Sequence, residues 1–126
     1  MPKTTSVNRR VPGYKYSRTA DRDLRAILQF TTSRFGRSQR QRYAELVDAA
    51  AALLGAEPMR IGSRRRDDLG RGIRSFHFEL AAQRRGAAAH VLYYVQGTLD
   101  DGRDGVIILR VLHERMDPAR HLSDEL

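Results

Sequence analysis

Residues 17–55 decide the fold, and they read SRTADRDLRAILQFTTSRFGRSQRQRYAELVDAAAALLG. Ser17 and Thr19 are suitable N-caps for a helix that runs to about Phe35, with aspartates in its first turn where the helix dipole favours negative charge. Gly36 is placed to end this helix, because glycine readily takes the left-handed conformation found after many helices. The apolar residues recur at spacings of three, four and seven, which is typical of one buried helical face: Leu24, Ile27, Leu28 and Phe35.

A second helix is predicted from about Arg40 to Leu54. Ser38 and Gln41 have the spacing of a capping box, and Gly55 follows the last periodic residue. The apolar stripe of this helix consists of Tyr43, Leu46, Val47, Ala50, Leu53 and Leu54. A loop of about three residues joins the two amphipathic helices, so they are expected to lie antiparallel. Neither helix can bury its whole apolar face against the other, so both need a sheet to pack on.

The second half of the chain is rich in strand-like segments. Three strands are predicted, at residues 73–80, 89–98 and 106–113, with glycine-containing hairpin loops between them. Residues 14–16, where two tyrosines flank a lysine, fit a further short strand. The order is therefore βααβββ, and the fold class is α+β, with an antiparallel helical hairpin packed on a small antiparallel sheet.

The length of 126 residues is sufficient for one domain, which we assign to residues 13–122. Residues 1–12 are predicted to be a flexible basic tail and residues 123–126 a polar tail. Residues 55–72 contain a proline and four glycines and are interpreted as a long basic connection between the helices and the sheet.

The composition limits the classes of function. A net charge of +8, from 23 basic and 15 acidic residues, predicts an anionic partner. The chain has no cysteine, so disulfides, thiolate chemistry and zinc sites with sulfur ligands are excluded. No apolar run approaches about 18 residues and no secretory signal is present, so we expect a cytoplasmic protein without a membrane association.

Common catalytic motifs are missing. The chain has neither a P-loop nor a GxGxxG opening a helix, and no GxSxG elbow presents a nucleophilic serine. Residues 113–117, HERMD, resemble the zinc motif HExxH only partly, because the second metal position is Asp117 and the segment follows a strand. We therefore expect no metal and no cofactor.

The densest basic run, Arg64-Arg65-Arg66, has two interpretations. Asp67 and Asp68 follow at once, so the run can be a solvated loop whose charges are partly neutralised. Alternatively, it is a loop that contacts an anion.

Two strand positions are candidates for exposed contact residues. Tyr93 and Tyr94 are adjacent, so one is expected in the core and the other on the surface. Arg110 lies within the apolar run VIILRVLH, and a period of two places it on one face with Ile108 and Leu112. If the helices cover the opposite face, Arg110 emerges on the open side of the sheet.

The segment at residues 110–117, RVLHERMD, resembles the RVLHxRMD signature of the ParE toxins in the ParE/RelE superfamily. The resemblance extends backwards in order through five further elements and covers about residues 14–122. These elements are Tyr16-Ser17 with Ala20, Asp23-Leu24 and Ile27; Phe35-Gly36 with Gln41 and Tyr43; Pro58, Gly62 and Leu69; Gly72-Ile73-Arg74; and His90 with Tyr94. The loops near residues 83–88 and 100–105 are longer than is typical of the family, which bears on partner specificity.

The resemblance implies the toxin of a type II toxin–antitoxin system, also called a plasmid stabilisation protein, with the same α+β fold. The family's usual activity is inhibition of DNA gyrase, which stops replication. Its partner is an acidic ParD-like antitoxin with a ribbon-helix-helix N-terminus, through which the toxin reaches operator DNA only indirectly. We expect the antitoxin to lie on the helical hairpin and along a sheet edge, and its contact candidates are Leu28, Phe35, Tyr43 and Tyr94.

The resemblance also supplies candidates for toxicity. They are Arg110, His113, Arg115, Met116 and Asp117 at the end of the last strand, with Arg65 and Arg74. A purely structural interpretation stays open, in which Arg115 pairs with Asp117 or Asp117 caps the turn before Pro118.

Two other functions remain as alternatives. A RelE-like toxin cuts mRNA on the ribosome without a metal, which requires a base, an acid and a cation at the phosphate. Against this, Glu114-Arg115 stands where such nucleases have a catalytic tyrosine. An inactive toxin that only binds its antitoxin is the third interpretation.

Overall fold

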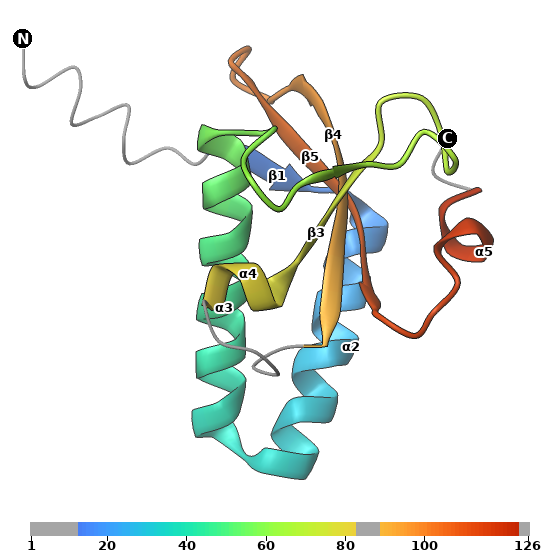
Figure 1. Ribbon diagram of the computed structural model, residues 1–126. Coiled ribbons are helices and arrows are strands. Elements are labelled where there is room, and N and C mark those ends of the chain that lie inside the picture. Colours follow the sequence, from blue (N-terminus) through green and yellow to red (C-terminus); the bar gives the residue numbers. More distant parts are fainter. Residues whose placement is uncertain (1–12, 83–88, 124–126) are drawn as a thin grey trace, which may run out of the picture.

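The computed structural model describes residues 13–82 and 89–123 and contains two layers (Figure 1). The first is an antiparallel pair of helices, α2 (Arg18–Phe35) and α3 (Arg37–Ala56), and the second is a five-stranded sheet. The predicted α+β class is therefore confirmed. The long loop at residues 83–88 and the basic tail at residues 1–12 lie outside the described residues.

The sheet is mixed, with strand order β1-β5-β4-β3-β2. Its strands are β1 (Tyr14–Tyr16), β2 (Arg64–Arg65), β3 (Arg74–His77), β4 (His90–Thr98) and β5 (Asp104–His113). All neighbours are antiparallel except β1, which runs parallel to β5, so the prediction of a wholly antiparallel sheet is wrong at this edge. Two short helices, α4 (Phe78–Ala82) and α5 (Pro118–Leu122), follow β3 and β5.

Helix α2 has the predicted limits. The Ser17 side chain accepts a hydrogen bond from the Ala20 N–H at 3.0 Å, so Ser17 and not Thr19 is the N-cap. At the other end, Gly36 has a φ of 89° and donates its N–H to Thr32 O at 2.9 Å. The local signals of serine and glycine were sufficient to place both ends.

Helix α3 begins three residues earlier than predicted. Gly36 caps both helices, because its carbonyl also accepts the Arg40 N–H at 3.2 Å, and no side chain caps α3. The predicted capping box at Ser38 is therefore wrong. A single residue joins the two helices.

The end of α3 is also later than predicted, because Gly55 lies inside the helix and not after it. A Cβ at this position would lie 2.6 Å from the carbonyl oxygen of Gly13, where the chain enters β1. Glycine is therefore required here for the close approach of two backbones. It does not end the helix.

The connection after α3 contains an element that the sequence did not reveal. Arg64 and Arg65 form β2, which pairs with Ser75 and Arg74 of β3. The strand predicted at residues 73–80 is shorter, because His77 Nδ1 accepts the Glu79 N–H at 3.0 Å where the chain turns into α4.

Buried clusters lie on both faces of the sheet. The helix-facing cluster includes Phe76, Leu92, Tyr94 and Ile108, and it packs against Val47 and Leu54 of α3, together with further residues of α2 and α3. A second cluster on the opposite face consists of Ile73, Tyr93, Leu109, Leu112 and Leu122. Leu122 is fully buried, so α5 covers part of this second face. No helix within the described residues is long and apolar enough to cross a membrane.

A β-bulge in β5 shifts the alternation of side chains between the two faces of the sheet. Tyr93 pairs with Arg110 and Tyr94 with Ile108, so Leu109 is an extra residue. Beyond the bulge Val111 joins the helix-facing cluster, while Leu112 joins the other. The predicted period of two is therefore wrong for Ile108, which faces the helices, whereas Arg110 and Leu112 share the opposite face.

We predict that Gly55→Ala destabilises the chain, although alanine is favoured over glycine in helices by about 1 kcal/mol. The new Cβ must displace the backbone of Gly13, and such overpacking costs about 1–3 kcal/mol. Urea unfolding followed by circular dichroism measures the change. Ala52→Gly, at an exposed position of the same helix, is the control and shows the ordinary helix preference. A rise in stability of Gly55→Ala would contradict the packing explanation.

Candidate functional site

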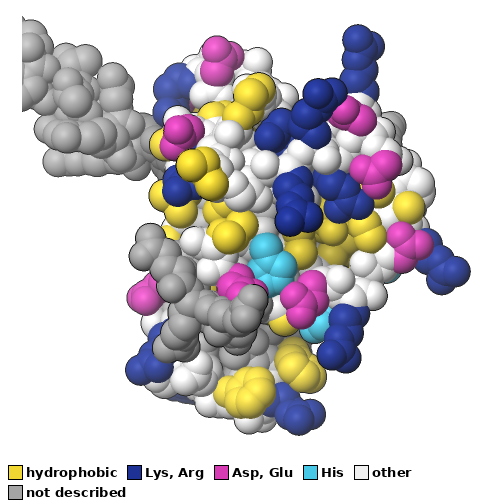
Figure 2. All heavy atoms as spheres, in the orientation of Figure 1, with side chains coloured by type: hydrophobic (Ala, Val, Ile, Leu, Met, Phe, Trp, Pro, Cys, Tyr) yellow, Lys and Arg dark blue, Asp and Glu magenta, His cyan; other side chains and the backbone are white. Residues whose placement is uncertain are grey.

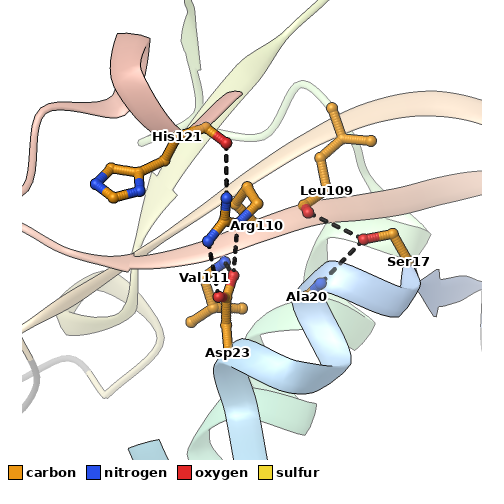
Figure 3. A network of polar contacts seen from close by, with 7 residues as sticks. All are labelled: Ser17, Ala20, Asp23, Leu109, Arg110, Val111 and His121. Atoms are coloured by element: carbon orange, nitrogen blue, oxygen red, sulfur yellow. Dashed lines mark hydrogen bonds and ion pairs between the residues drawn. The ribbon is translucent and has the colours of Figure 1, made fainter. Parts of the chain in front are cut away.

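Arg110, the first residue of the RVLHERMD segment, forms a largely buried ion pair with Asp23 of α2 (Figure 3). Its Nε and Nη2 donate to the two carboxylate oxygens at 2.8 and 2.9 Å, and its Nη1 donates to the His121 carbonyl oxygen at 2.6 Å. The two charged side chains are only 16% and 14% exposed. The guanidinium therefore links α2, β5 and α5.

The position of this pair follows from the short β1. The strand pairs with β5 only as far as Ile108, and α2 continues along the same edge. Ser17 then donates its N–H to Ile108 O and its hydroxyl to Leu109 O, and Asp23 accepts the Val111 N–H at 3.0 Å. The prediction that Arg110 lies on the sheet face opposite the helices agrees with its pairing to Tyr93 of the second cluster. The guanidinium does not emerge into solvent, because Asp23 and the His121 carbonyl hold it at the strand edge.

The residues after β5 form a tight turn at the surface. Arg115 donates its N–H to His113 Nδ1 at 3.1 Å, and Met116 donates to the His113 carbonyl at 2.9 Å. The side chains of Arg115 and Met116 are exposed, and Arg115 forms no ion pair with the residues that the structure describes. Asp117 accepts the Ala119 N–H at 3.1 Å and caps α5, so the capping interpretation is confirmed.

His113 belongs to an aromatic cluster between α3 and the sheet. Its ring centroid lies 5.4 Å from that of His90, and the Tyr43 hydroxyl is hydrogen-bonded to His90 Nδ1. Burial, followed by the charges of His113 and His77, lowers the pKa of His90 to about 4. His90 is therefore neutral at pH 7, and Tyr43, whose pKa burial raises, is a packing residue as well as a contact candidate.

Arg65 and Arg74 do not meet the end of β5. Arg65 forms an ion pair with Asp67 at 2.5 Å at the edge of the sheet. Arg74 donates from Nε to Ser63 Oγ at 2.8 Å, and the same hydroxyl is hydrogen-bonded to Tyr94. Arg74 therefore fastens the loop that precedes β2, and the predicted toxicity residues do not form one group.

A cavity of about 540 Å³ lies on the sheet face opposite the helices. It is lined by Gly62, Arg64, Arg66, Ser75, His77, Glu79, Leu80, Val91 and Tyr93. On this side of the molecule, basic side chains gather above the histidine at the centre of the view, and acidic side chains lie beside it (Figure 2). Arg65, the candidate predicted from the sequence, does not line the cavity. Its neighbours Arg64 and Arg66 do, because alternate residues of an extended segment point to the same side.

The other end of the cavity is acidic and already hydrogen-bonded. His77 Nδ1 accepts a backbone N–H, so its Nε2 carries the proton and donates to Glu114 Oε2, 2.7 Å away. The hydrogen bond from His77 lowers the pKa of Glu114. No group of His, Asp or Glu side chains in the described part of the chain is arranged to hold a metal ion.

The antitoxin candidates lie at different depths. Phe35 is 63% exposed near the tip of the helical hairpin and Leu28 is half-buried. Phe30, which sequence reasoning had not selected, is 60% exposed on the same helix. Tyr94 is fully buried and Tyr93 is 5% exposed, so the prediction that one of them is a surface residue is wrong, and Tyr94 cannot contact a partner in this conformation.

We predict that Arg110→Ala lowers the free energy of unfolding by about 3–5 kcal/mol, because Asp23 is left as a buried unpaired charge. Urea unfolding measures the loss. Arg120→Ala, whose exposed guanidinium lies 3.9 Å from Asp117, is the matched control and should change stability by less than about 0.5 kcal/mol. The double variant Asp23→Ala/Arg110→Ala should lose less than the two single losses added. An Arg110→Ala protein as stable as the wild type would contradict this role.

Comparison with known proteins identifies the family. The family model described as the ParE toxin of the type II toxin–antitoxin system, parDE, matches residues 14–118. No curated protein matches the chain. The matched region contains all five strands of the sheet, both long helices, the Asp23–Arg110 pair and the exposed turn after β5. By this match, the chain belongs to the ParE toxin family of type II toxin–antitoxin systems.

Proposed function

We propose that this chain inhibits DNA gyrase and that a ParD-like antitoxin neutralises it in the cytoplasm. The observation that carries the proposal is the match to the ParE toxin family over residues 14–118. The turn after β5 supports a target-binding role, because it holds Arg115 and Met116 exposed on a fixed backbone. On this proposal the chain acts by binding an enzyme and carries out no reaction itself.

Some residues of the RVLHERMD segment have structural roles, which reduces the number of residues that can contact gyrase. Arg110 is engaged by Asp23 and Asp117 caps α5, so both already have structural roles. Arg115 is the cation of this segment that remains exposed, and Met116 beside it is 46% exposed. We therefore assign gyrase contact first to Arg115 and Met116, with His113 positioning the turn.

The cavity is the observation that favours the RelE-like alternative, since two arginines and a histidine line it. Cleavage of RNA needs a proton acceptor and a proton donor that are open to the substrate. His77 has one ring nitrogen on the Glu79 N–H and the other on Glu114. This engagement favours gyrase inhibition over ribonuclease activity.

The proposed antitoxin surface is the helical hairpin. Phe30 and Phe35 are large apolar side chains that stay exposed, and Leu28 on the same helix is half-buried. Aromatic side chains of this kind are common anchors of protein interfaces. The net charge of +8 favours rapid association with an acidic partner, and operator DNA would be reached only through that partner.

We predict that the purified wild-type chain inhibits supercoiling by gyrase and traps cleaved DNA, and that Arg115→Glu raises the concentration needed at least tenfold. Reversing an exposed charge at a contact weakens binding without affecting the fold. Arg120→Glu is the control, since this exposed arginine lies on α5 outside the turn. Thermal unfolding of all three proteins checks that the fold is unchanged.

Three results would count against this proposal. Arg115→Glu that inhibits as well as the wild type would remove the assigned contact. A wild-type chain without effect on gyrase would contradict the proposed target, and cleaved mRNA in arrested cells would then support the ribonuclease. Absence of growth arrest on induction would identify a chain that only binds its antitoxin.

We also predict that Phe30→Ser/Phe35→Ser weakens binding of the ParD-like antitoxin by about tenfold or more, while gyrase inhibition is retained. Titration calorimetry measures the affinity. Met59→Ser is the control, because Met59 is similarly exposed but lies outside the helical hairpin. Equal affinities for the hairpin variant and the wild type would place the antitoxin elsewhere.

A further inference from the structure

We propose that the cavity on the open face of the sheet binds an extended acidic peptide segment, with a carboxylate at Arg64 and Arg66 and an apolar side chain at Leu80 and Val91. The inference deepens the proposed function and rests on it only for the source of the peptide, which is then the acidic segment of the antitoxin. The cavity is lined by no residue of the helical hairpin, and it meets the turn after β5 at Glu114, which is hydrogen-bonded to the lining residue His77.

The cavity has a volume suitable for a ligand, and the loop before β2 closes one of its sides. Its volume of about 540 Å³ lies within the usual range of about 300–1,000 Å³ for ligand sites. Gly62 has a φ of 99°, and a Cβ there would lie 2.8 Å from Leu80 Cδ1 and 3.3 Å from Phe76. The positive φ favours glycine here, and the absence of a Cβ lets the loop before β2 approach Leu80 of α4 on this side of the cavity.

The basic end matches an extended peptide. Arg64 and Arg66 are two residues apart along the chain and line the same cavity, so their backbones lie about 7 Å apart. Carboxylates at alternate positions of an extended peptide have the same spacing. Arg64 is exposed and forms no ion pair within the described residues, so its charge is available to a ligand.

Arg66 is already oriented for such a contact. Asp68 accepts from its Nε and Nη2, both at 3.1 Å, and the guanidinium lies 5.9 Å from the ring centroid of Tyr93. A side chain held in this way loses little conformational entropy when it binds. The basic end therefore combines one free arginine with one that is fixed in place.

The opposite end determines the direction of the peptide. Glu79 lines the cavity beside His77, and His77 is hydrogen-bonded to Glu114. A ligand carboxylate at this end would meet two negative charges, whereas one at the β2 end meets the charge of Arg64, unpaired within the described residues, beside the Arg66–Asp68 pair. Between the ends, Leu80 and Val91 offer an apolar surface, and Leu80 is 47% exposed.

These features favour a peptide over a nucleic acid. A nucleic acid strand carries a phosphate at each nucleotide, so it would place negative charge near Glu79 and Glu114 as well as near the arginines. It also needs an open aromatic face for stacking. Tyr93 is 5% exposed and its ring lies against Arg66, so it offers no such face.

The test is a titration of the full-length, ¹⁵N-labelled chain with the peptide acetyl-Asp-Val-Asp-Leu-Ser-Lys-amide, followed by amide chemical shifts. The control peptide has asparagine in place of both aspartates. We expect saturable shifts at Arg64, Arg66, Ser75 and His77 with the acidic peptide, at least tenfold weaker binding of the control peptide, and an affinity that falls with added salt.

Matched variants locate the binding. Arg64→Glu and Arg64→Ala should each weaken the acidic peptide about tenfold or more, and Arg42→Glu, at an exposed position of α3, should leave the affinity within twofold. The dispersion of the amide spectra shows whether each variant is folded. Two Arg64 variants of different charge keep the test valid if one of them does not fold.

Several results would overturn the inference. These are the absence of saturable shifts, shifts confined to the helical hairpin, equal binding of both peptides, or a single-stranded RNA dodecamer that binds the same amides more tightly. Gyrase inhibition by Arg64→Glu is measured in parallel and should equal that of the wild type. A wild-type chain that inhibits gyrase but does not bind the peptide would contradict the inference alone, and a wild-type chain that binds the peptide but does not inhibit gyrase would contradict the proposed function alone.

Discussion

The carboxylate of Asp23 is the contact on which the arrangement of this chain depends. It accepts two hydrogen bonds from the Arg110 guanidinium and one from the Val111 N–H. Because β1 pairs with β5 only as far as Ile108, this side chain of α2 satisfies an edge of β5 that β1 does not reach. Arg110 in turn donates to the His121 carbonyl and holds α5. A buried ion pair adds little net stability when its desolvation is counted, but it penalises any other register of these elements.

The bulge at Leu109 lies next to that contact in β5. The two faces of the sheet differ in how completely the helices cover them. The helix-facing side is closed by α2 and α3, whereas α5 covers only part of the other side and leaves the cavity beside β2. The molecule thus offers separate surfaces: the exposed aromatic residues of α2, the turn after β5, and the cavity. Separate surfaces allow one small chain to bind a target and an antitoxin through different residues.

The RVLHERMD segment shows how one motif serves both folding and surface presentation. Arg110 and Asp117 are held by contacts within the chain, and His113 organises the turn. Arg115 and Met116 project from that turn. The loss of activity in a variant of this segment therefore has to be interpreted together with its stability.

The sequence by itself determined the α+β class, both ends of α2 and the approximate places of β4 and β5, because these follow from local signals: the Ser17 cap, Gly36 and dense apolar runs. Tertiary contacts decided the rest. Position 55, inside α3, needs glycine because Gly13 passes against it, and β2 is a strand through its pairing with β3. The candidate site was predictable at the exposed turn, yet the cavity depends on Arg64 and Arg66 sharing a face across that pairing. The place of Arg110 depends on a bulge and on Asp23, 87 residues away in the chain. The spacing of apolar residues along the chain cannot predict such contacts, because the interacting residues are distant in sequence.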